Sequence, residues 1–259
     1  MRETEAQTRY LKSLRNRRRQ VAILRFSLFI GFLVLWEAAA RLRWIDSFIF
    51  SSPYGLADTL LTMLREQSLL SHIGVTLWET LLSFLLVMIL SVGAAVLLWL
   101  FPRFAEVSEP YMVVLNSLPK SALAPLLIVW LGANMRTIIV AGISVALFGS
   151  IMNLYTGFRE TDPDMLKLIR TLGGKKGACL AKVILPSSVP YLISTFKVNI
   201  GLCLVGVVIG EFIGARKGLG YLIIYGSQVF KLNMVILSIV ILCVIAVVLY
   251  ALLGLLEKR

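Results

Sequence analysis

Residues Val75 to Phe101 read VTLWETLLSFLLVMILSVGAAVLLWLF and are apolar at nearly every position. A bilayer core about 30 Å thick is crossed by about 20 apolar residues in a helix, and this stretch exceeds that length. The whole chain agrees, since 58% of its 259 residues are hydrophobic, 15% are charged and the mean hydropathy is +0.86. The sequence therefore predicts a membrane protein.

Windows of this kind occur six times, which predicts an all-α membrane protein with about six transmembrane helices. One helix is N-terminal to a core of five, and a basic tail of residues 1–25 precedes a transmembrane domain of residues 26–259. The windows are Phe26–Leu42, Val75–Phe101, Val107–Leu131, Thr137–Thr156, Tyr191–Ile213 and Met234–Leu256.

The first window could instead be a cleaved signal peptide, because an arginine-rich leader precedes it and Ala38, Ala39 and Ala40 lie at its end. The leader is long, however, and the later windows already commit the chain to the membrane. We therefore expect the first helix to be retained.

Lysine and arginine indicate the orientation of these helices. With the N-terminus cytoplasmic, the inner segments hold 17 basic residues and the outer segments hold seven, which predicts that both termini are cytoplasmic. The net charge of +12 then mostly reflects topology. The cluster Arg15, Arg17, Arg18 and Arg19 accordingly favours an anchor at anionic membrane lipid over a nucleic-acid site.

Signatures of catalysis are absent from the sequence. There is no phosphate-binding loop, no H-E-x-x-H and no G-x-S-x-G motif, and the single histidine is His72. Cys179, Cys203 and Cys243 have no metal-ligand spacing. We expect no catalytic residue, no metal and no cofactor in this chain, so its energy must come from elsewhere.

The stretch TLGGKKGACLAKVILPSSVP, Thr171 to Pro190, interrupts the apolar runs. Before it, Asp162 can cap a short helix that begins at Pro163. Gly173-Gly174 then breaks this helix, and Lys175–Leu185 can form a second helix that ends at Pro186. The apolar face of the first helix would carry Met165, Leu168, Ile169 and Leu172. Such a pair of helices could dock in a groove of a partner protein, or it could rest on the membrane interface.

The third window holds Pro110, Pro119 and Pro125, with Asn116 and Lys120 between them. Prolines inside a span free backbone groups that need partners in protein or in a wet cavity, so we expect a broken helix that lines a pathway. Measured along a straight helix, Lys120 would lie about 20 Å from the inner end. Its charge then either lines the pathway or reaches the headgroups.

Glu211 is a lone acid near the outer end of the fifth window, where it could act in a gate or form an ion pair with Arg216 or Lys217. Gly206 and Gly210 on the same span favour close helix packing. Residues 214–233 are too polar and too short to span, which predicts an outer-face helix or a re-entrant segment containing the flexible positions Gly218 and Gly220.

Gly173, nine further residues and then Val183-Ile184-Leu185-Pro186 resemble the cytoplasmic loop signature of the membrane-spanning subunits of type I ABC importers. SSPYGLADTL from Ser51, NSLPKSALAPLLIVWLGA from Asn116, DPDMLKLIRTLGG from Asp162 and GEFIGARKGLGYLI from Gly210 resemble the nitrate, sulfonate and taurine branch of that family. The resemblance covers about residues 45–255. One departure is Lys167-Leu168-Ile169, where the family has a Glu-Ala-Ala triplet.

This resemblance implies a permease whose loop, about residues 158–190, docks on an ATPase subunit. The residues that it assigns to this loop are Asp162, Pro163, Met165, Lys167, Leu168, Ile169, Leu172, Gly173, Gly174, Val183, Leu185 and Pro186. The candidates for the pathway and its gate are Asn116, Pro119, Lys120, Glu211, Gly218 and Gly220.

The resemblance also implies the partners. They are two ATPase subunits that hold ATP and magnesium, an extracytoplasmic solute-binding protein and a second permease copy in a homodimer, all at a bacterial cytoplasmic (inner) membrane. The solute would be a sulfonate, taurine, nitrate or a vitamin precursor. The alternative is a self-powered secondary transporter or channel, which would need inverted repeats and paired intramembrane acids, and the sequence shows neither.

Overall fold

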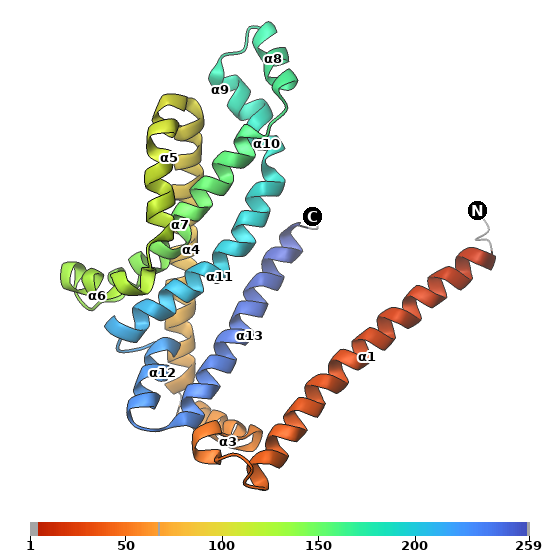
Figure 1. The fold of residues 1–259 in the computed structure, drawn as a ribbon, viewed down its shortest axis with the longest axis vertical. Coiled ribbons are helices and arrows are strands. Elements are labelled where there is room, and N and C mark those ends of the chain that lie inside the picture. The colour runs from red at the N-terminus through yellow and green to blue at the C-terminus, as the bar shows by residue number, and fades with distance from the viewer. Residues whose placement is uncertain (1–4, 67, 258–259) are drawn as a thin grey trace. The chain divides into compact units, whose positions relative to one another are not determined.

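The computed structural model describes residues 5–66 and 68–257, and every regular element in them is a helix (Figure 1). The all-α fold predicted from the sequence is therefore confirmed. The chain divides into two compact units, residues 1–62 and residues 63–259.

The first unit is dominated by one long helix, α1 (Glu5–Arg41), so the basic segment predicted as a tail is helical from residue 5. The candidate span within it is Leu14–Arg41. Glu37 near its end accepts hydrogen bonds from the Arg41 side chain at 2.7 Å and from the Tyr54 backbone N–H at 3.1 Å. Two shorter helices follow, α2 (Ser47–Phe50) and α3 (Pro53–Arg65), the second of which continues across the boundary of the units.

The second unit contains the remaining helices, of which the long ones run back and forth along one direction (Figure 1). A short π-helical turn, η1, joins two of them. In chain order the elements are α4 (Ser68–Leu100), α5 (Pro102–Ser117), α6 (Lys120–Leu131), α7 (Met135–Arg159), α8 (Pro163–Thr171), α9 (Lys176–Cys179), η1 (Leu180–Ile184), α10 (Leu185–Ser187), α11 (Val189–Gly214), α12 (Leu219–Gln228) and α13 (Leu232–Glu257).

Within the described residues, five helices are long and apolar enough to cross a membrane, and α5 with α6 passes the same test as a pair. The predicted number of about six spans is thus confirmed. The pair is bent by 94°, so the broken helix expected from the prolines of the third window is confirmed.

The break between α5 and α6 falls at Leu118 and Pro119. Proline has no N–H to continue the helix, and it forces the residue before it out of the helical region. Leu118 accordingly has ψ 136° and Pro119 has ψ 101°. Pro110 and Pro125 lie inside α5 and α6 without ending them.

Small residues bring α4, α7 and α11 close together. A Cβ on Gly206 of α11 would lie 2.8 Å from the carbonyl oxygen of Ala141 in α7, and one on Gly142 would lie 2.6 Å from Ser83 Oγ in α4. Helix packing without voids in a membrane uses such residues because no hydrophobic force draws spans together there. The predicted packing role of the α11 glycines is confirmed.

Candidate functional site

The loop between α7 and α11 projects from one end of the second unit (Figure 1). Asp162 caps α8 by accepting a hydrogen bond from Asp164 N at 2.9 Å, and Pro163 takes the first helical position. Gly173 then ends the helix with φ +82°, a conformation that favours glycine. The predicted sequence of capped helix, glycine break and second helix is therefore confirmed.

The second helix of this loop differs from the prediction. It is α-helical only over Lys176–Cys179 and widens into the π-helical turn of Leu180–Ile184. Pro186 lies just beyond and cannot accept the regular helical geometry, because its ring clashes with the carbonyl four residues earlier. The widened turn lets the chain pass through Pro186 into α10, whereas the sequence predicted a stop there.

One face of α8 presents Met165, Leu168 and Leu172, which we call the loop stripe. These side chains are 55%, 58% and 75% exposed. Ile169, predicted on the same face, instead packs on the turn, where a Cβ on Gly174 would lie 2.5 Å from its Cγ2. Lys167 pairs within α8 with Asp164 at 2.8 Å, and both side chains are exposed.

The far end of the loop is anchored in the core. Ile184 is fully buried in a cluster with Ala95, Leu154 and Phe158, and Leu185 packs against the same cluster. Val183 is also buried. These residues of the loop signature therefore hold the loop to α4 and α7, and the loop stripe is the part left for contact with another molecule.

Lys120 at the start of α6 folds back over the break. Its ammonium donates to the carbonyl oxygen of Leu115 and lies 5.7 Å from the centre of the Phe148 ring. In a continuous helix that carbonyl would accept from residue 119, but Pro119 has no N–H. Lys120 thus replaces the missing donor, and its role in the pathway stays a prediction. Asn116 is exposed, and its Oδ1 would lie 3.2 Å from a Cβ on Gly149 of α7.

At the opposite end of the second unit, the N-terminus of α12 is capped by side chains from other helices. Gly218 N donates to His72 Nδ1 at 3.0 Å, Leu219 N donates to Thr76 Oγ1 at 2.8 Å, and Gly220 N donates to Glu211 Oε2 at 2.6 Å. The first N–H groups of a helix have no partner within it, and no side chain at Gly218 can cap them. We call His72, Thr76 and Glu211 the α12 clamp.

Both glycines of this turn are required by the clamp. Gly218 has φ +118°, and a Cβ there would lie 2.3 Å from the Glu211 carboxyl carbon. A Cβ on Gly220 would lie 2.8 Å from Glu211 Oε2 and from Glu211 Cβ. The glycines therefore allow the α12 backbone to approach the acid.

Glu211 is 1% exposed, and its second oxygen accepts from Thr76 Oγ1 at 2.7 Å. The ion pair that the sequence offered as an alternative does not form, because Arg216 and Lys217 are exposed and form no salt bridge in the part of the chain that the structure describes. Glu211 instead satisfies a helix N-terminus, where its negative charge is favoured by the helix dipole.

Glu79 of α4 is 2% exposed and lies close to Glu211, and its Oε2 has no hydrogen-bond partner in the part of the chain that the structure describes. The sequence interpretation that paired intramembrane acids are absent is thus wrong. Glu79 is the one charged residue of the Val75–Phe101 stretch, so the reasoning applied to Glu211 could have found it. His72 and Thr76 carried no comparable signal, since their role depends on the position of α12.

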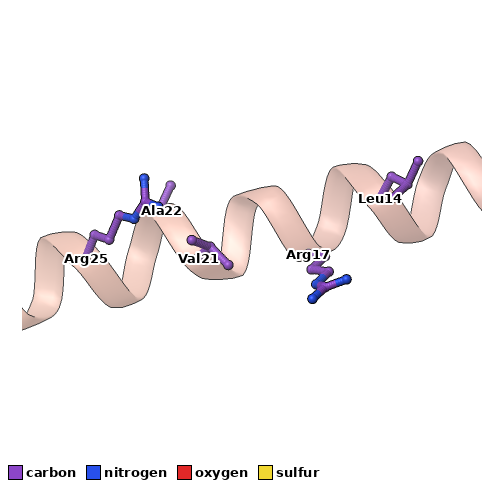
Figure 2. A pocket seen from close by; sticks show the side chains of 5 residues that line it. All are labelled: Leu14, Arg17, Val21, Ala22 and Arg25. Atoms are coloured by element: carbon purple, nitrogen blue, oxygen red, sulfur yellow. The ribbon is translucent and has the colours of Figure 1, made fainter.

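The α1 helix carries its own basic surface. Figure 2 shows Arg17 and Arg25 projecting from the helix beside Val21, with Leu14 on the same stretch. Alternating cations and apolar side chains on one helix suit the boundary between headgroups and acyl chains. Among the described residues, no group of three or more histidine, cysteine or acidic side chains could hold a metal ion.

Comparison with known proteins places this geometry in a family. Residues 87–259 match the family described as "Binding-protein-dependent transport system inner membrane component". A probable ABC transporter permease protein of Haemophilus influenzae is 30% identical over 232 residues, which cover 89% of this chain and 94% of that protein. A putative aliphatic sulfonates transport permease protein of Bacillus subtilis is 25% identical over 231 residues, covering 88% and 82%.

Two solved structures share the fold. The MetNI methionine ABC transporter in inward-facing conformations superposes with a TM-score of 0.66 at 16% identity, covering 75% of this chain and 96% of the solved one. An amino acid ABC transporter with histidines gives a TM-score of 0.62 at 19% identity, covering 77% and 97%.

Proposed function

The chain belongs to the family of binding-protein-dependent transport system inner membrane components. From that premise we propose which role each end of the second unit has in an ABC importer. It is a permease subunit, a membrane-spanning transport component that is not itself an enzyme. The loop at one end is proposed to receive the force of ATP hydrolysis, and the α12 clamp at the other end to close the pathway.

The loop stripe carries the first half of this proposal. Met165, Leu168 and Leu172 are exposed on a helix that projects beyond the spans, and α8 is joined through Gly173 to a segment buried among α4 and α7. Apolar side chains at this spacing are typical of a helix that docks in a groove. A push on α8 would reach the spans through Ile184 and its neighbours.

The α12 clamp supports the second half. α12 is too short to cross a membrane and is held at its N-terminus by three side chains from α4 and α11. Relative movement of α4 and α11 would therefore release or reposition α12. We propose that Glu211, with Gly218 and Gly220, forms the outer gate, while Asn116, Pro119 and Lys120 shape the pathway at the bent pair.

Importers of this family work with an ATPase subunit and a solute-binding protein. We propose two copies of each of the permease and the ATPase, with ATP and magnesium bound on the ATPase alone, and both permease termini cytoplasmic at a bacterial inner membrane. The proposed solute is a small sulfonate, taurine or a vitamin-precursor-like molecule. Relatives named for aliphatic sulfonates, taurine, formylaminopyrimidine and riboflavin support this range.

The decisive experiment replaces the loop stripe with Met165→Ser, Leu168→Ser and Leu172→Ser together. The side chains are exposed, so the variant should insert normally, but copurification of the ATPase subunit should fall by about tenfold or more, as expected for lost apolar anchors. Arg170→Ser, on the opposite face of α8, is the control that should retain the ATPase. Full retention by the triple variant, or uptake by vesicles without any ATPase, would contradict the proposal.

A further inference from the structure

A second basic surface lies where α4 turns into α5. A cavity of about 680 Å³ is lined there by Leu100, Phe101, Pro102, Arg103 and Phe104, together with Lys176 of α9. Lys176 reaches it from far along the chain, and its Nζ donates to the carbonyl oxygen of Leu100 at 3.2 Å. Residues of α4, α5 and α9 thus line one site.

The cations of this site are not neutralised by the protein. Neither Arg103 nor Lys176 forms a salt bridge within residues 5–66 and 68–257. Both residues are exposed, and among the described residues only the Lys176 side chain has a hydrogen-bond partner, the Leu100 carbonyl. Two positive charges beside one cavity create a positive potential that an anion can satisfy.

The walls of the site are apolar and lie at the end of a membrane span. Phe101 and Phe104 are each more than half exposed, although they are among the largest side chains of the turn. The apolar helix α4 ends at Leu100, Phe101 follows it, and Arg103 comes two residues after Phe101. This change from apolar to basic residues, flanked by aromatic rings, is typical of the depth at which headgroups meet acyl chains.

We propose that this cavity binds one anionic phospholipid. Its phosphate lies between the Arg103 guanidinium and the Lys176 ammonium, since both donate strong hydrogen bonds to phosphate and Arg can do so through two N–H groups. Its acyl chains run along Phe101 and Phe104 toward the bilayer. Basic pockets between elements at a membrane face bind acidic headgroups in this way.

Through Lys176, a lipid bound at this site would also contact the loop between α7 and α11. Lys176 begins α9, three residues after the Gly173 hinge, and its ammonium is fixed at the end of α4. A bound phosphate would hold α9 against the α4 turn through the same ammonium. The basic surface of α1, with Arg17 and Arg25, makes no such connection, because all of its lining residues belong to one helix.

The test is native mass spectrometry of the assembled permease and ATPase, with phosphatidylglycerol or phosphatidylcholine added in equal amounts. The wild-type complex should retain one phosphatidylglycerol per permease with about 10- to 30-fold preference, as two near-surface cations provide. Arg103→Gln with Lys176→Gln should reduce the preference to near unity. Arg103→Lys keeps the charge and should retain most of it.

The control is Arg136→Gln with Lys231→Gln, which removes two exposed charges near the end of the bundle where α7 begins and α12 ends. It should leave the preference unchanged. Equal retention of both lipids by the wild type, or an unchanged preference in Arg103→Gln with Lys176→Gln, would overturn the proposal. So would retention seen only after the ATPase is removed, since the ATPase would then cover this surface.

Discussion

The Thr76 hydroxyl donates to the Glu211 carboxylate at 2.7 Å and at the same time accepts from the backbone N–H of Leu219 at 2.8 Å. One side chain of α4 thereby connects α11 to the first turn of α12. Because Glu211 also accepts from Gly220 N, the three helices share a closed set of hydrogen bonds. A change at either side chain is expected to act on the attachment of α12.

Glu211→Gln should loosen this attachment without unfolding the bundle. A neutral amide forms weaker bonds than a carboxylate, and hydrogen bonds to charged groups contribute about 1.5–3 kcal/mol against about 0.5–1.5 kcal/mol for neutral pairs. A loss of about 1 kcal/mol would shift the gate equilibrium about fivefold. In reconstituted transporter we expect raised basal ATP hydrolysis that the loaded binding protein stimulates less.

The matched variant is Thr76→Val, which keeps the side-chain shape but removes the hydroxyl that joins Glu211 to Leu219. It should reproduce the phenotype of Glu211→Gln, and the double variant should add little to either. Unchanged basal hydrolysis, stimulation and uptake in both single variants would end the gate hypothesis.

Gly218→Ala should displace α12 more strongly. The new Cβ would overlap the Glu211 carboxyl group, and φ +118° is strained for any residue with a Cβ. We expect a fall of several degrees in the melting temperature and loss of uptake. Gly93→Ala in α4 is the control, because nothing lies within 4 Å of its Cβ and alanine favours the helix. Equal stability of the two variants would contradict the role of Gly218 in the clamp.

The positions of the helices could be predicted from the sequence, because apolar windows and helix-breaking residues determine a helix through residues that are close in the chain. Window length predicted the spans, Pro119 predicted the broken helix, and Asp162, Pro163 and Gly173 predicted the start and end of α8. Each of these signals depends on residues close in the chain.

The clamp could be predicted only in part. An acid inside a membrane span is unusual, so the sequence singles out Glu211, but the partners that it offers are only the nearby Arg216 and Lys217, as an alternative to a gate. The actual partners are a hydroxyl of another helix and a backbone N–H, and which side chains face α12 depends on how α4 and α11 pack. The bond between Lys120 and Leu115 could not be predicted for the same reason, since it exists only because the helix bends.

Gly173→Leu should impair ATPase copurification while insertion into the membrane stays normal. A Cβ there meets nothing within 4 Å, so the cost arises from φ +82° and not from a clash. Gly173→Asn should be milder, because asparagine tolerates the left-handed region. Gly177→Leu is the control, with equal space and no positive φ. If both leucine variants retain the ATPase equally, the turn at Gly173 is not needed for docking.

Lys120→Met tests whether the bent pair α5–α6 depends on the ammonium at the break. The variant keeps a flexible apolar stem but leaves the Leu115 carbonyl without the donor that replaces Pro119 N, and it removes the cation from the Phe148 ring. An unsatisfied carbonyl costs about 1–3 kcal/mol away from water, so uptake and melting temperature should both fall. Lys120→Arg retains a donor and a cation and should preserve most of each property. Uptake should be compared at matched expression levels in vesicles. Loss of uptake with unchanged stability would mean that Lys120 acts on the solute and does not hold the bend. Normal uptake and normal stability in Lys120→Met would show that the bend needs neither the hydrogen bond to Leu115 nor the cation at Phe148.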